Sequence, residues 1–140
     1  MTDVFDAMDA LVAVFDGIDG LTTDIGPVDN IVAAPAALLV EAGDGEFLNY
    51  LITSDGEVDA QLTITVMVQA TTLTSAKPLL RPYLADNGTQ SVRALVAADS
   101  TLGNVVTDAV VTSASNLGRY TIGDTERRYY GVTFNVAVML

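Results

Sequence analysis

The chain has 140 residues, of which half are hydrophobic and only 17% are charged. This composition excludes a disordered chain and predicts one domain spanning residues 1–140. The net charge is −12, with no histidine and no cysteine, which excludes a Ser/His/Asp triad, thiol nucleophiles, disulfides and thiolate metal sites.

The first predicted element is a helix over residues 3–18, with Asp3 or Thr2 as its N-cap. Apolar residues recur there at helical spacing, while Asp6, Asp9 and Asp16 fall on other faces. The apolar set is Val4, Met8, Leu11, Val12, Phe15 and Ile18. We expect this face to lie on a sheet.

Strands are predicted in the next part of the chain. Residues 21–37 read as irregular because they contain Gly26, Pro27 and Pro35. Short strands are expected over 38–41 and 47–53, each followed by a turn that contains glycine. Residues 58–70 then alternate strictly between apolar and mainly polar side chains, which predicts a long strand with one covered face.

Two short helices are predicted after this strand. Thr74 can cap the first, over 75–83, and Pro78 and Pro82 are expected to limit it to one or two turns. Ser91 can cap the second, which reaches Ala98 and turns Val92, Leu95 and Val96 inward.

The end of the chain is predicted to be a hairpin. A strand is expected somewhere within 105–113, and residues 119–122 then turn through 123–125 into a final strand over 126–140. The order of elements predicts an α+β domain, with an antiparallel or mixed sheet that carries the N-terminal helix and the two short helices on one face.

Few residues suggest chemistry. No phosphate-binding glycine loop is present, and the acids at 44, 46, 55, 57 and 59 match no calcium-loop spacing. Turns often carry Asp and Gly, so these acids read as exposed turn residues. We expect a protein that is not an enzyme and that uses no cofactor or metal.

Residues 60–140 contain a set of structural positions that resemble a known family. They are Leu80, Pro82, Tyr83, Leu84, Gly88, Ser91, Val92, Leu95, the run 99–103 (DSTLG), Gly118, Tyr120, Gly123, Tyr129 and Gly131. The pattern resembles tail terminator and neck proteins of long-tailed bacteriophages, especially those that infect actinobacteria.

This resemblance implies a structural virion protein made in the host cytoplasm. It implies a ring, of six copies, that stops polymerisation of the tail tube and joins the tail to the head connector, with DNA passing through the lumen. The implied partners are further copies of the chain, the tail tube protein and the connector or stopper protein, and no membrane is expected. Another neck component, such as a stopper protein, and a monomeric protein-binding module are the alternatives.

The charge distribution suggests how copies could meet. Residues 1–60 hold 13 of the 18 acids and none of the six bases, whereas residues 61–140 are near neutral. Opposite signs can then face each other across a contact between copies, although the acids can equally serve solubility alone. The predicted subunit or ring interface consists of Lys77, Arg81, Arg119, Arg127 and Arg128. The predicted acidic surface consists of Asp6, Asp9, Asp16, Asp44, Glu46, Asp55 and Glu57.

Overall fold

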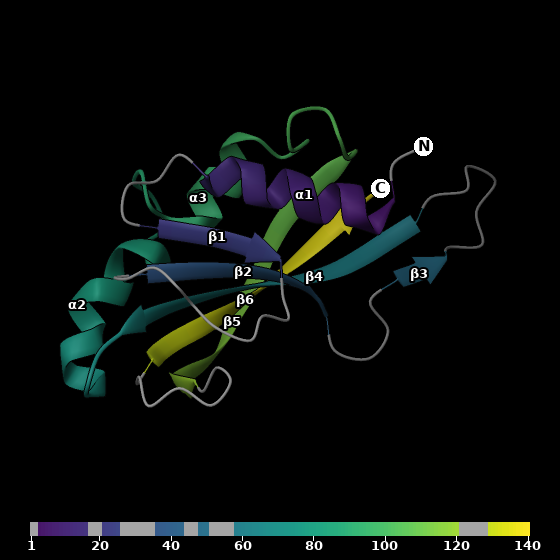
Figure 1. Cartoon of the computed structure of the whole chain (residues 1–140). Coiled ribbons are helices and arrows are strands. Elements are labelled where there is room, and N and C mark those ends of the chain that lie inside the picture. The colour runs from purple at the N-terminus through teal and green to yellow at the C-terminus, as the bar shows by residue number, and fades with distance from the viewer. Residues whose placement is uncertain (1–2, 17–20, 26–35, 44–47, 51–57, 121–128) are drawn as a thin grey trace.

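The chain has an α+β fold in which helices cover one face of a sheet (Figure 1). A computed structural model describes residues 3–16, 21–25, 36–43, 48–50, 58–120 and 129–140. Their elements are α1 (Val4–Phe15), β1 (Leu21–Ile25), β2 (Ala36–Ala42), β3 (Leu48–Tyr50), β4 (Val58–Gln69), α2 (Leu73–Leu84), α3 (Val92–Ala98), β5 (Asp108–Tyr120) and β6 (Tyr129–Met139). The predicted fold class is confirmed.

The sheet is mixed. Its strand order is β1-β2-β4-β6-β5, and β3 pairs separately with β4. β1 and β2 are parallel, and the other pairs are antiparallel. The prediction that residues 21–37 are irregular is wrong at both ends, because β1 begins at Leu21 and β2 begins at Ala36. The breakers Gly26, Pro27 and Pro35 lie between these strands rather than in them.

One face of the sheet forms the core together with all three helices. The long strand predicted here is confirmed, and its apolar positions Ala60, Leu62, Ile64, Val66 and Val68 are all buried. The expectation of a single covered face holds only in part, because Thr65 and Met67 on the second face are buried as well. β6 adds Val132, Phe134, Val136 and Val138 to the same cluster. The helices contribute Leu11 and Phe15 from α1, Leu80 from α2, and Val92 and Val96 from α3, with Leu95 partly buried beside them.

Helix α1 begins where the sequence predicts and ends earlier. The Asp3 carboxylate accepts a hydrogen bond from the Asp6 backbone N–H at 2.8 Å, and the Asp6 carboxylate accepts one from the Asp3 N–H at 3.1 Å. This reciprocal pair is a capping box, with Asp in place of the usual Glu. Asp16 is the C-cap, so the helix does not extend to residue 18 as predicted.

Helix α2 is longer than predicted. It has 12 residues and starts one position after its N-cap Thr72, not after Thr74. Pro78 and Pro82 lie inside it, four residues apart, and both are exposed. A proline has no N–H to donate to the carbonyl four residues earlier, so the carbonyls of Thr74 and Pro78 lose their helical partners. Both residues lie on the exposed side of the helix, where water can bind these carbonyls, and the helix continues.

Ser91 joins the end of α2 to the start of α3. Its side chain is fully buried, and its Oγ accepts a hydrogen bond from the Ala94 N–H at 3.1 Å. The same hydroxyl donates to the carbonyl of Ala85, the C-cap of α2. The Ser91 hydroxyl therefore caps the start of α3 and also provides a hydrogen-bond donor for the carbonyl at the end of α2.

Replacing Ser91 with alanine is expected to lower the free energy of unfolding by about 1–3 kcal/mol, since it removes a cap and leaves a carbonyl without its partner. Thr72→Ala is the control, because Thr72 caps α2 at an exposed position. There the loss should be about 1 kcal/mol or less. Urea unfolding of both variants measures the difference, and equal losses would contradict the bridging role of Ser91.

Strand β5 is much longer than the segment predicted within 105–113. It runs for 13 residues as an edge strand beside β6, and Arg119 and Tyr120, assigned to a separate strand by sequence, are its last two residues. Its register shifts between Val111 and Ser113 and again between Ser115 and Gly118. These bulges break the two-residue alternation that marks a strand in sequence. The predicted turn at 123–125 lies outside the described residues.

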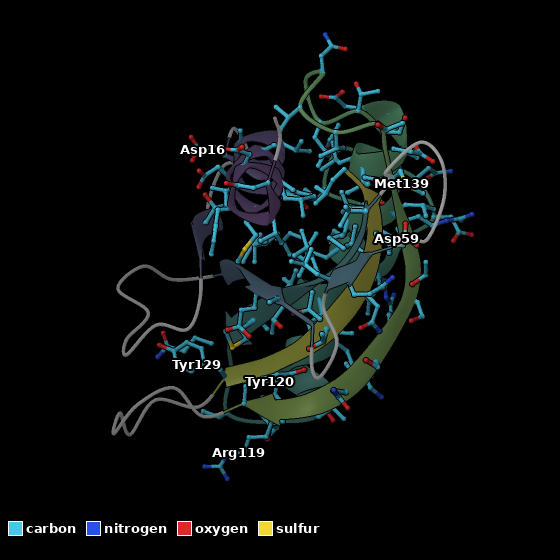
Figure 2. The ribbon with its side chains drawn as sticks, turned by 90° about the vertical axis from the view of Figure 1, so that its right-hand side faces the viewer. Asp16, Asp59, Arg119, Tyr120, Tyr129 and Met139 are labelled. Carbon is cyan, nitrogen blue, oxygen red and sulfur yellow. The ribbon has the colours of Figure 1, made fainter. Side chains whose placement is uncertain are left out.

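The second face of the sheet carries a small hydrogen-bonded group. The Tyr120 hydroxyl donates to the Asn116 carbonyl at 2.8 Å and lies 2.9 Å from Thr133 Oγ1, which is 3.2 Å from Thr65 Oγ1. Because a carbonyl can only accept, the bonds run from Thr65 through Thr133 to Tyr120. Tyr120 pairs with Tyr129 at the ends of β5 and β6 (Figure 2). This group fixes β5 over β6 where the ladder is irregular.

Candidate assembly surfaces

The described residues contain no group of three or more acidic side chains placed to hold a metal ion. Burial raises the pKa of the Tyr83 phenol above its ordinary value of 10.0, so this hydroxyl stays neutral near pH 7 and is no base. Two exposed surfaces combine apolar and charged side chains.

The first surface is a hollow between α2 and β5, with a volume of about 170 Å³. Leu80 is buried at its base, while Leu73 and Leu84 of α2 and Leu117 of β5 are exposed around it. Lys77 and Arg81 also line it, and the sequence of α2 contains no acid. We call these six residues the cationic hollow. It combines an apolar interior with two positive charges.

The predicted interface residues are placed together only in part. Lys77 and Arg81 lie in the cationic hollow, one helical turn apart. Arg119 is exposed and projects outward from the end of β5 (Figure 2). Within the described part of the chain the only ion pair joins Arg93 to Asp86 at 3.3 Å, so these three cations have no carboxylate partner there. Arg127 and Arg128 lie outside the described residues.

The sequence alone does not predict that leucines line an exposed surface here, although Leu80 and Leu84 belong to the family-like pattern. The predicted helix covered only 75–83, which left Leu73 and Leu84 outside it. With the true bounds, Leu73, Lys77, Arg81 and Leu84 recur at three- or four-residue spacing, which would have shown the stripe. Leu117 gives no signal in the sequence, because it lies inside the irregular stretch of β5 between Ser115 and Gly118.

The second surface is the outer side of α1. Phe5 is 70% exposed, the largest exposed fraction among the large hydrophobic side chains described. Asp6 and Asp9 are exposed beside it, and α1 with its two caps contains four aspartates and no base. We call Phe5, Asp6 and Asp9 the acidic knob. Asp16 lies at the other end of α1, where its carboxylate accepts a hydrogen bond from Thr23 Oγ1.

Further acids lie at the same end of the sheet as the acidic knob. Asp59 of β4 and Asp108 of β5 both pair with Met139 of β6, so these two acids lie on either side of Met139 at this end of the sheet. Figure 2 shows Asp59 beside Met139. Of the predicted acidic surface, Asp44, Glu46, Asp55 and Glu57 lie outside the described residues.

The two surfaces are at opposite ends of the molecule. Figure 1 shows α2 at one end of the sheet and the first turn of α1 at the other, beside the end of β6. The cationic hollow and the acidic knob therefore cannot meet within one chain. Acids from both halves of the sequence, Asp6, Asp9, Asp59 and Asp108, lie at the end opposite the cationic hollow, although Asp16 and Asp86 lie elsewhere.

No known protein family matches this chain, and no curated protein sequence is significantly similar to it. Among the described helices, none has both the length and the apolar character needed to cross a lipid bilayer.

Proposed function

We propose that this protein is a structural component of a bacteriophage neck, which forms a ring at the head–tail junction, ends polymerisation of the tail tube and joins the tail to the head connector. The observation that carries this proposal is the placement of two unlike surfaces, each with exposed apolar side chains and opposite charge, at opposite ends of one small domain. The resemblance of residues 60–140 to tail terminators supplies the biological setting.

Unlike surfaces at opposite ends favour assembly over other functions. A contact between different surfaces leaves a free surface on each copy, so it continues until a ring closes or a filament grows. Carboxylates of the acidic end that take no part in a contact between copies also suit a passage for DNA, because they repel phosphates and the genome slides. The proposed partners are therefore other copies, the tube and the connector, with no sequence-specific contact to DNA.

The alternative of a monomeric binding module rests on the free edge of β5. Residues 112–117 of this edge strand are all exposed, and an extended peptide could add to it as a further strand. Such a module would bind one ligand per chain and stay a monomer.

Mass measurement in solution and electron microscopy with purified tail tubes test the proposal. Rings, or discs on tube ends together with shorter tubes when the protein is present during polymerisation, are the expected result. Rings that bind the head connector and ignore tubes would indicate a stopper protein instead. A protein that stays monomeric at all concentrations and leaves tubes unchanged would overturn the proposal.

A further inference from the structure

We infer that the acidic knob of one copy docks into the cationic hollow of the next, with the Phe5 ring between Leu73, Leu84 and Leu117. The inference rests on the proposed function, since it names the contact by which copies would join. It follows from three properties of the surfaces, which are volume, charge and position.

The volume of the hollow fits an aromatic ring. A cavity of roughly 150 Å³ lined by apolar side chains accommodates benzene, and the hollow measures about 170 Å³ with four leucines around it. Phe5 has the largest exposed fraction among the large hydrophobic side chains described, and it lies in the first turn of the 12-residue helix α1. A buried aromatic side chain in a well-packed pocket can supply much of the binding energy of an interface.

The charges beside the ring are complementary to those of the hollow. Asp9 follows Phe5 by one helical turn, so both lie on one side of α1. Lys77 and Arg81 have the same spacing on α2 and form no ion pair among the described residues. With Phe5 seated between the leucines, its neighbouring carboxylates meet these cations, which sets the orientation of the contact.

The position of the surfaces makes the contact head-to-tail. Because α2 and the first turn of α1 lie at opposite ends of the sheet (Figure 1), each copy can use both surfaces at once with two different neighbours. A ring follows when the rotation between neighbours closes.

Leu84 and Leu79 of α2 are compared to test whether copies associate through the hollow. Leu84→Ala and Phe5→Ala should each weaken association about thirty-fold, as expected for loss of an interface anchor. Leu79→Ala should change it less than about three-fold. Leu79 is 42% exposed and Leu84 is 41% exposed, but only Leu84 lines the hollow. Equal effects of the two leucine variants would overturn the inference.

A charge exchange tests the orientation. Asp9→Arg and Arg81→Asp should each weaken association several-fold, and the double variant should recover to within about three-fold of the original protein. Asp9 is chosen because Asp6 belongs to the capping box of α1. Arg93→Asp serves as the control, since Arg93 pairs with Asp86 outside the hollow.

Disulfide trapping tests directly whether the acidic knob and the cationic hollow of two copies touch. The chain has no cysteine of its own, so only introduced cysteines can form a link. At a protein concentration raised to offset the loss of both side chains, the double variant Phe5→Cys and Leu84→Cys should form a ladder of linked copies on oxidation, while Phe5→Cys with Leu79→Cys should not. If rings or tube-end discs form but all these variants behave alike, the inference fails and the proposed function stands. If no assembly or tube binding occurs at all, both fail.

Discussion

Replacing Phe15 with alanine is expected to lower the free energy of unfolding by about 3–5 kcal/mol, the range for large-to-small changes at buried aromatic residues. Phe15 is the last residue of α1, it has no exposed surface, and it packs in the cluster that joins α1 to the sheet. Small domains are stable by only about 5–15 kcal/mol, so the variant should lose a large fraction of its stability.

Phe5→Ala is the matched control on the same helix. Since Phe5 is 70% exposed, its removal should change the free energy of unfolding by less than about 0.5 kcal/mol. Urea unfolding followed by circular dichroism measures both variants, with association suppressed by dilution. The two phenylalanines should thus separate folding from assembly: Phe15 affects stability, and Phe5 affects association. A large loss of stability from Phe5→Ala would place that side chain in the fold rather than in a contact.

The sequence predicts elements well where one periodicity runs without interruption. The alternation from Val58 to Gln69 and the helical spacing of Val4, Met8 and Leu11 both lead to the observed elements, because each pattern marks the side chains that pack in the main core. Prediction from the sequence fails where tertiary contacts override the local preferences of the residues. The prolines of α2 are tolerated because both are exposed, and β5 continues past its bulges because β6 pairs with it on both sides of them.

The candidate surfaces were predictable only in part, for a similar reason. Charge can be counted along a sequence, so Lys77, Arg81, Asp6 and Asp9 were identified. An exposed leucine differs from a buried one only by its surroundings, and Leu84 lies four residues from Leu80, which is buried. The apolar half of each surface therefore needs the fold, and only the fold places the two surfaces at opposite ends.

Gly131 and Gly118 are expected to differ strongly in whether they tolerate a side chain. They lie directly opposite each other on β6 and β5, and the sequence treats them alike. A Cβ on Gly131 would lie 2.5 Å from the Val66 carbonyl oxygen, 2.8 Å from Met67 Cγ and 3.2 Å from the Tyr120 ring. Gly118 has no atom within 4 Å of the same position. Of these two positions, only Gly131 needs a glycine because of close packing.

Gly131→Ala is therefore expected to lower the free energy of unfolding by about 3 kcal/mol, near the upper end for overpacked sites. The methionine side chain can move, but a strand carbonyl cannot withdraw unless β4 moves away from β6, and the Tyr120 ring would also shift from its bonds to Thr133 and Asn116. Gly118→Ala should be neutral or slightly stabilising, since alanine restricts the unfolded chain more than glycine does. Urea unfolding compares the two variants, and a similar loss from both would show that glycine matters here for backbone freedom rather than for the close approach of Tyr120 and β4.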